Sequence, residues 1–401
     1  MNEPLRIGIT CYPTHGGSGV LATELGTQLA RRGHSVAFIS YSAPLRLGAL
    51  PDRITFHEVQ GVEYPLLKQF PYTLALAAKM VEVARAQQLQ LLHVHYAIPF
   101  APAAILAKQM TPELDLRVIT TLHGTDTSLV GAAPSFWPVT QFAIQQSDAV
   151  TTVSDALREE TIETFDVTRQ IDVIPNFIDP DQFSVGSAAS DRSPTLVHIS
   201  NFRPVKRIDR VLDVFVGVHA RLPQVRLLLV GDGPELPRVL ARAKQLGVHE
   251  QISTIGVVDD VAPFLRDADV LLLPSETESF GLVALEAMAS GVPVVASRAG
   301  GLPEVVPHGQ AGYLLPSADT AGMIEKIASI LADAELSKRL GAAGRAYAVA
   351  HFSSELIVPR FEALYRRVLA VAGVPVWSPP PLVAARATGP RSSATRPPVG
   401  A

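Results

Sequence analysis

The sequence is poor in cysteine, in charge and in long apolar runs. Its 401 residues include one cysteine, Cys11, which excludes an intramolecular disulfide and is typical of a reducing compartment such as the cytoplasm. Only 18% of residues are charged and the net charge is −4, so nothing favours a nucleic-acid partner. No run of 18 or more apolar residues occurs, and the first predicted strand begins near the N-terminus. We therefore expect neither a membrane-spanning helix nor a signal peptide.

Apolar, β-branched runs alternate with helical patterns along most of the chain. Such an alternation favours parallel sheets that are covered by helices on both faces. The predicted strands are Arg6–Thr10, Ser35–Ser40, Ile54–Val59, Leu91–His95, Arg117–Leu122 and Ala149–Val153 in the first half, then Leu196–Ile199, Arg226–Val230, Ile252–Ile255, Val270–Leu273 and Val292–Ala296. The sequence thus predicts an α/β protein with two similar halves.

The alternation breaks between Pro175 and Pro194, where Gly, Ser, Pro and polar residues replace it. We predict a first domain over residues 1–175, a linker over 176–194 and a second domain over 195–353. Both are expected to be Rossmann-like and doubly wound, facing each other across a cleft at the carboxyl ends of their strands. Residues 375–401 contain seven prolines and no acidic residue, so this tail is predicted to be disordered.

The segment Glu276–Glu286 is the most informative motif. Glu278 and Glu286 lie eight residues apart, with a Phe-Gly step between them that follows an apolar strand and opens a helix. A helix N-terminus at the end of a parallel strand attracts phosphate, because its first N–H groups lack partners. Carboxylates repel phosphate but suit hydroxyls, so the segment predicts a nucleotide-sugar site. The alternative is a capped amphipathic helix with two exposed acids.

Two further turns follow predicted strands. Gly16 and Gly17 lie in a turn that allows the backbone to approach a ligand closely, although an ordinary tight turn would look the same. Arg203 and Lys206 lie three residues apart in another turn, from which either cation reaches a diphosphate. Fixed cations there would stabilise a leaving nucleoside diphosphate. The alternative is a solvated basic turn.

A third turn carries His123, directly after the strand Arg117–Leu122 and before Gly124. A histidine at the carboxyl end of a strand is placed to hydrogen-bond a ligand, although a lone histidine is more often structural. Tyr96 follows the preceding strand and is expected on the same rim of the cleft. His93 lies inside that preceding strand, Leu91–His95, and is predicted to be structural.

Two Asp-x-Asp spacings raise the question of a metal ion. They are Asp179–Asp181, in the interdomain stretch, and Asp267–Asp269, at the amino end of a predicted strand. The second pair lies on the wrong side of the sheet for ligand binding. We expect no metal and no cofactor, with Arg203 and Lys206 supplying the positive charge instead.

Together these motifs resemble family 4 of the two-domain, GT-B-fold retaining glycosyltransferases, over roughly residues 5–370 and including Gly300–Val305. The resemblance implies that Glu286 holds the donor ribose and Glu278 the transferred sugar, with His123, Arg203 and Lys206 also at the reacting centre. It also implies a last helix, Ser354–Ala372, that crosses back onto the first domain. The remaining implied donor-binding residues are Gly16, Gly17, Gly256, Val258, Gly281, Leu282 and Val283.

Within the family, several stretches look like the members that transfer N-acetylglucosamine from UDP to L-malate in bacillithiol biosynthesis. These stretches are 9–13, 16–19, 95–99, 120–126 and 176–179. Carried over, the implied acceptor-binding residues are Ser18, Arg46, Tyr96, Thr121 and Asn176. Gln141 departs from the pattern, because family members often have a basic residue there. Retention without an evident nucleophile fits attack on the face from which the diphosphate leaves.

Two other functions stay open. One is a family 4 enzyme with a sugar, inositol or lipid acceptor, which an acceptor screen would distinguish. The other is a non-catalytic nucleotide-binding protein, which has no need to keep Glu278, Glu286, Arg203, Lys206 and His123 together. UDP-N-acetylglucosamine and L-malate are the expected small-molecule partners, and a homo-oligomer is also open.

Overall fold

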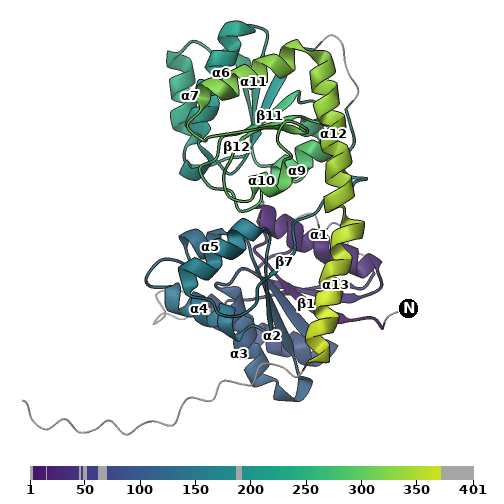
Figure 1. Ribbon diagram of the computed structural model, residues 1–401. Coiled ribbons are helices and arrows are strands. Elements are labelled where there is room, and N and C mark those ends of the chain that lie inside the picture. Colours follow the sequence, from purple (N-terminus) through teal and green to yellow (C-terminus); the bar gives the residue numbers. More distant parts are fainter. Residues whose placement is uncertain are drawn as a thin grey trace, which may run out of the picture.

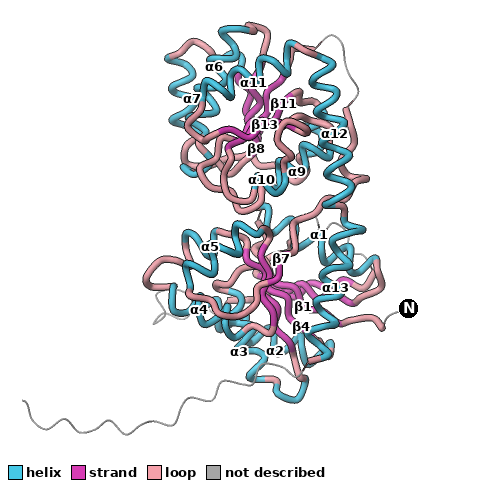
Figure 2. Tube along the Cα trace, viewed as in Figure 1, coloured by secondary structure: helices cyan, strands magenta, loops and turns pink. Residues whose placement is uncertain are grey.

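The computed structural model describes residues 3–14, 16–44, 47, 52–61, 70–186 and 192–371. It contains two parallel sheets, one in each of two stacked domains (Figures 1 and 2). The first sheet has the strand order β3-β2-β1-β4-β5-β6-β7 and the second has the order β10-β9-β8-β11-β12-β13. The predicted fold class, two doubly wound α/β domains, is confirmed.

The strands of the first domain are β1 (Arg6–Thr10), β2 (Ser35–Ser40), β3 (Ile54–Glu58), β4 (Leu91–His95), β5 (Arg117–Leu122), β6 (Ala149–Thr152) and β7 (Asp172–Val173). Its helices are α1 (Gly17–Arg31), α2 (Tyr72–Gln87), α3 (Phe100–Met110), α4 (Trp137–Gln146) and α5 (Asp155–Phe165). Side chains on one face of the sheet pack with α2 and α3, and those on the other face pack with α1. Because both faces are covered, the central strands are apolar throughout.

The strands of the second domain are β8 (Thr195–Ile199), β9 (Arg226–Val230), β10 (Ile252–Ile255), β11 (Val270–Leu273), β12 (Val294–Ser297) and β13 (Gly312–Leu315). Its helices are α6 (Ile208–Arg221), α7 (Leu236–Gln245), α8 (Ala262–Arg266), α9 (Leu282–Ala289), α10 (Leu302–Val305), α11 (Thr320–Ala332) and α12 (Ala334–Phe352). A short 3-10 turn, η3 (Pro204–Lys206), follows β8. None of the helices in the described ranges is long and apolar enough to cross a membrane.

The last helix, α13 (Ser354–Ala370), returns to the first domain. It continues from α12 along one side of the molecule (Figure 1). Phe361 and Tyr365 are buried against the first sheet, where the Tyr365 hydroxyl lies 2.8 Å from His93 Nδ1. Where the chain returns, the Ile178 N–H donates to the Phe352 carbonyl, and the Ile178 carbonyl accepts the Ser354 N–H. These bonds join the segment that leads into the second domain to the segment that leaves it.

The sequence prediction missed several elements. The strands β7 and β13 and the helices α5, α8, α10 and α12 were not predicted, because β7, α8 and α10 are short and the others lie in polar or glycine-containing stretches. Arg46 and the tail 375–401 lie outside the described residues.

Each sheet reverses its strand order once, between β1 and β4 in the first and between β8 and β11 in the second. In open α/β sheets, ligands bind at the carboxyl ends of the strands next to such a reversal. Most residues predicted for the site follow these strands or their neighbour β5, whereas Gly256 and Val258 follow β10 and Asn176 follows β7. The topology therefore gathers them at two edges that meet at the domain boundary.

Candidate active site

The helix α9 begins at the boundary between the domains, and its N-terminus is open. Gly281 precedes it with φ +93°, and a Cβ there would lie 2.5 Å from Leu302 Cδ2, so the turn requires glycine. The first intrahelical bond runs from the Ala284 N–H to the Gly281 carbonyl, which leaves the N–H groups of Leu282 and Val283 ahead of it. The first turn has no acidic residue and no side-chain cap. This end suits an anion.

The helix α1 of the first domain presents a second open N-terminus beside it. Gly16 is the N-cap residue, again without a side-chain cap or an acid in the first turn. A Cβ on Gly17 would lie 3.4 Å from Leu282 Cδ2 of α9, so the two helix starts approach each other across the boundary. The arrangement offers positive partial charge from both domains to one anionic ligand or to two neighbouring ones.

Lys206 and Glu278 form an ion pair at this place. The Lys206 ammonium lies 2.9 Å from Oε1 and 2.5 Å from Oε2 of Glu278, and the side chains are 21% and 11% exposed. Arg203, three residues earlier, is exposed. Glu286 is 7% exposed within α9. The Lys206–Glu278 pair thus lies shortly before the start of α9, with Arg203 on the same turn as Lys206 and Glu286 in the second turn of the helix.

His123 is held by a second histidine. Its Nε2 lies 3.0 Å from His95 Nδ1, and the two rings stack with centroids 5.2 Å apart. Burial lowers the pKa of His123 to about 3 and lowers that of His95 well below its ordinary value. Both imidazoles are therefore neutral near pH 7, so His123 acts there as a hydrogen-bonding group without charge.

Tyr96 adopts φ +104°, a conformation that is rare for a residue with a side chain. Its hydroxyl lies 3.2 Å from the Ser18 hydroxyl at the start of α1. Burial is the main cause that raises the pKa of Tyr96, so the phenol stays protonated and donates or accepts hydrogen bonds. Unusual backbone at a non-glycine residue is concentrated at functional sites.

The turns that carry Tyr96 and His123 are joined by Asp126, for which the sequence suggested no role. The carboxylate accepts hydrogen bonds from the backbone N–H groups of Ala97, at 2.8 Å, His123, at 3.1 Å, and Gly124, at 3.0 Å. Burial outweighs these bonds and raises the pKa of Asp126 to about 6. The Asp three residues after the histidine was the available signal, since Asp commonly closes local turns.

Asn176 and Thr121, also predicted for the acceptor, and Gln141, where the sequence departs from the family, are buried or hydrogen-bonded within the first domain. Asn176 is 7% exposed, and its buried Oδ1 has no hydrogen-bond partner among the described residues. Thr121 is 1% exposed and its hydroxyl lies 2.7 Å from both His93 Nε2 and Thr151 Oγ1, inside the sheet. Gln141 donates its amide to the Phe165 carbonyl, so it braces α4 against α5. The acceptor role of Thr121 stays a prediction.

Gly256 and Val258 follow β10, at the same edge of the second sheet as η3. Gly256 is exposed and Val258 is half-buried, with Val257 between them 50% exposed. An exposed backbone stretch with apolar side chains is a suitable surface for a nucleobase. The uracil contact implied by the family resemblance stays a prediction.

The two Asp-x-Asp spacings are engaged elsewhere. Asp179 lies 3.4 Å from Arg31, and Asp269 lies 2.7 Å from Arg192. Within the described ranges, no group of three or more His, Cys, Asp or Glu side chains is arranged to hold a metal ion.

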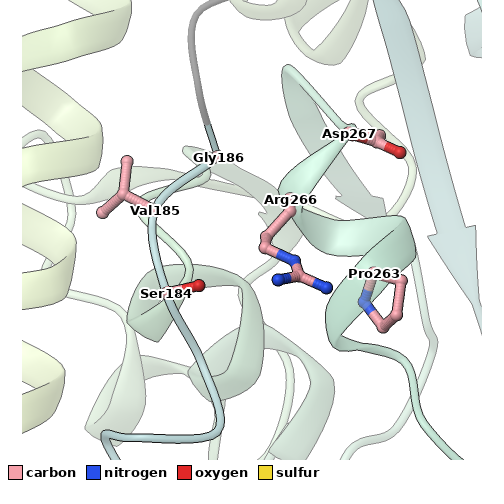
Figure 3. A pocket seen from close by; sticks show the side chains of 6 residues that line it. All are labelled: Ser184, Val185, Gly186, Pro263, Arg266 and Asp267. Atoms are coloured by element: carbon pink, nitrogen blue, oxygen red, sulfur yellow. The ribbon is translucent and has the colours of Figure 1, made fainter.

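Asp267 lines a surface pocket near the amino end of β11, at the opposite end of the sheet from Glu278 (Figure 3). The Arg266 side chain extends beside Pro263, whereas the Val185 side chain points away from Arg266. The pocket is formed by Ser184, Val185, Gly186, Pro263, Arg266 and Asp267. Its position sets it apart from the site at the domain boundary.

Comparison with known proteins gives two adjoining family matches. Residues 15–182 match the family described as Glycosyltransferase Family 4, and residues 181–347 match Glycosyl transferases group 1. A protein of Bacillus anthracis named N-acetyl-alpha-D-glucosaminyl L-malate synthase is 45% identical over 373 residues, which cover 91% of this chain and 97% of that protein.

Among solved structures, sucrose-phosphate synthase from Thermosynechococcus elongatus aligns with a TM-score of 0.74 and 23% identity, over 91% of this chain and 99% of that one. Anabaena Alr3699/HepE in complex with UDP-glucose aligns with a TM-score of 0.73 and 20% identity, over 91% and 99% of the two chains. These likenesses show the fold.

Proposed function

Because the chain belongs to glycosyltransferase family 4, we propose that it transfers N-acetylglucosamine from UDP-N-acetylglucosamine to the hydroxyl of L-malate, the first step of bacillithiol biosynthesis. The observation that carries the proposal is the 45% identity to the Bacillus anthracis synthase over 97% of its length. The single cysteine favours a cytoplasmic location for the reaction.

For the donor, the diphosphate is proposed to lie at the open N-terminus of α9. The N–H groups of Leu282 and Val283 would bind phosphate oxygens, with Lys206 and Arg203 beside them. Glu286 would bind the ribose hydroxyls, since a buried carboxylate accepts two hydrogen bonds from a diol. Glu278 would then bind a hydroxyl of the transferred sugar.

The proposed chemistry follows from charge. As the glycosidic bond breaks, the departing diphosphate gains negative charge, and fixed cations and helix N–H groups stabilise this transition state more than the ground state. The departing phosphate oxygen would take the proton of the malate hydroxyl as it attacks from the same face, so the α configuration is retained. Lys206 and Arg203 are proposed to supply the charge without a metal ion.

For the acceptor, the proposed pocket lies between α1 and the Tyr96 turn. Ser18 and Tyr96 present paired hydroxyls 3.2 Å apart, and the α1 N-terminus offers free N–H groups to a carboxylate. Asn176, which is 7% exposed, is proposed as a further acceptor-binding residue. A site that pairs both carboxylates of malate would discriminate against acceptors that lack one of them.

The direct test is incubation with UDP-N-acetylglucosamine and one acceptor at a time, following UDP release and product mass. We expect turnover with L-malate, and turnover lower by about 5- to 150-fold with L-lactate, glycerol or inositol, because an unpaired buried donor costs about 1–3 kcal/mol. Equal turnover with inositol or a lipid would refute the proposed acceptor. Activity that is lost in excess EDTA and restored by Mn²⁺ would refute the metal-free mechanism.

A further inference from the structure

Glu304, on α10 of the second domain, forms hydrogen bonds with the first domain. Its Oε2 accepts the backbone N–H of Asp155 at 2.8 Å, and its Oε1 accepts that of Ala156 at 2.9 Å. These are the first two residues of α5, which belongs to the first domain. A carboxylate at a helix N-terminus satisfies N–H groups that have no intrahelical partner and complements the helix dipole. One domain thus supplies the cap for a helix of the other.

The N-cap residue of α5 joins the domains a second time. The Ser154 hydroxyl accepts the Leu157 N–H at 3.1 Å, as N-cap serines do, and donates to the Ser279 carbonyl at 2.6 Å. Ser154 is 1% exposed, so this contact is shielded from water. Ser279 follows Glu278 in the loop that leads to the start of α9 at Leu282. The start of α5 is therefore bonded to the loop that carries the predicted sugar-binding carboxylate.

The contacts that Glu304 and Ser154 make across the domain boundary are linked to the Glu278 loop and to the His123 turn. On the second domain, the Gly301 N–H donates to the Glu278 carbonyl at 2.8 Å, which links α10 to the Glu278 loop. On the first domain, Gly124, next to His123, leaves no room for a side chain, because a Cβ there would lie 1.7 Å from Ser279 Oγ. The contact between α5 and α10 therefore sets how closely the His123 turn approaches the Glu278 loop.

We propose that Glu304 is a positioning residue for the transferase reaction. By capping α5 across the domain boundary, it holds the first domain in the closed arrangement in which His123 and the acceptor pocket face the Glu278 loop. The inference rests on transfer between the two domains and not on the identity of the acceptor. Both hydrogen bonds require the domains to be together, so an open arrangement leaves the Asp155 and Ala156 N–H groups to water.

The first test is hydrogen exchange of the full-length protein in the presence of UDP. We expect the Asp155 and Ala156 amides to be protected in the wild type and to exchange at least about 10-fold faster in Glu304→Ala, with Glu304→Gln between them because its amide carbonyl accepts one bond. Asp319→Ala is the matched control, since Asp319 caps α11 within the second domain through the Gly322 N–H at 2.8 Å. The control should leave these amides protected. Unprotected amides in the wild type, or unchanged protection in Glu304→Ala, would overturn the proposal.

The second test is steady-state kinetics well below the melting temperature. Glu304→Ala should lower kcat by about 10-fold, while the KM for the UDP-sugar changes less than about 3-fold. In the proposed function, the donor binds mainly to the second domain, whereas transfer requires the first domain to close over it. Ser154→Ala, which removes the contact to Ser279, should show the same split. Asp319→Ala should leave both constants near the wild-type values. Equal kinetics of Glu304→Ala and Asp319→Ala would contradict the positioning role. Absence of malate turnover by the wild type would refute the proposed acceptor and leave the exchange test intact.

Discussion

The Lys206 ammonium lies within hydrogen-bond distance of both carboxylate oxygens of Glu278, at 2.9 and 2.5 Å, so two residues predicted to bind different parts of the donor are paired with each other. Each partly buried charge balances the other. In the proposed function, a bound diphosphate would compete with Glu278 for Lys206 and thereby free the carboxylate for a sugar hydroxyl. The pair would then couple the phosphate contact to the sugar contact, and removing either residue leaves the other as an unpaired charge.

Lys206→Ala is expected to lower kcat by about 10²-fold, because it removes a cation that stabilises charge on the departing diphosphate. Arg203→Ala should act in the same direction. Steady-state kinetics with the UDP-sugar checks this, with Lys244→Ala on the exposed face of α7 as the control for loss of a surface cation. Near-wild-type turnover in both variants would remove these cations from the mechanism. In a double-mutant cycle, Lys206→Met and Glu278→Gln should be non-additive, since the residues are in contact.

Glu286→Gln is expected to raise the KM for the UDP-sugar by about 10-fold and to change kcat little, because ribose contacts persist equally in the ground state and the transition state. Glu325→Gln, an exposed acid of α11, is the matched control. A loss confined to kcat would assign Glu286 to the reacting centre instead.

Tyr96→Phe is expected to raise the KM for L-malate by up to about 10-fold, the cost of about one hydrogen bond, while the donor KM stays within about 2-fold. The variant keeps the ring, which packs edge-on against Tyr12 at 5.3 Å, so the fold should not change. Tyr41→Phe removes a hydroxyl from a tyrosine that is 41% exposed in the same domain and should have no such effect. A donor KM that rises as much as the malate KM would move Tyr96 out of the acceptor pocket.

Stability should fall as the pH is lowered from 7 to 5. Burial lowers the pKa of His93 and His123 to about 3 and that of His198 to about 4, so these rings stay neutral in the folded state while the unfolded chain binds protons below its ordinary pKa of 6.5. The unfolded state then holds more protons, and the fully buried His93 and His198 each remove about 1–2 kcal/mol by pH 5, whereas the partly buried His123 removes less.

Asp126 acts in the opposite direction. Its pKa is raised to about 6, so the cost of its buried charge is relieved as the pH falls through that value. One acid does not offset three histidines, so the net slope of stability with pH stays positive between 5 and 7. Denaturant unfolding at both pH values measures the slope, and His93→Asn should reduce it. A stability that is constant between pH 5 and 7 would contradict the buried neutral histidines.

Local sequence was sufficient for the elements at the centre of each sheet. Val270–Leu273 was predicted and found with the same bounds, because a short apolar run between polar turns favours a strand covered on both faces. The positions of Glu278, His123 and Arg203 after strands were also evident from the order of motifs. In parallel sheets, the carboxyl ends of strands meet at one edge, so strand order brings Glu278 and Arg203 together in the second domain, whereas His123 lies at the edge of the first.

Only the tertiary structure decided which side chains meet. The pairs Lys206–Glu278 and His95–His123 join residues 72 and 28 positions apart, and Glu304 reaches Asp155 over 149 positions and from another domain. No local periodicity encodes such contacts, because the first two depend on which strands are neighbours in one sheet and the third depends on how two sheets dock. The helix α5 shows the same limit in part: Ser154 caps it locally, but its first two N–H groups are bound by a carboxylate of the second domain.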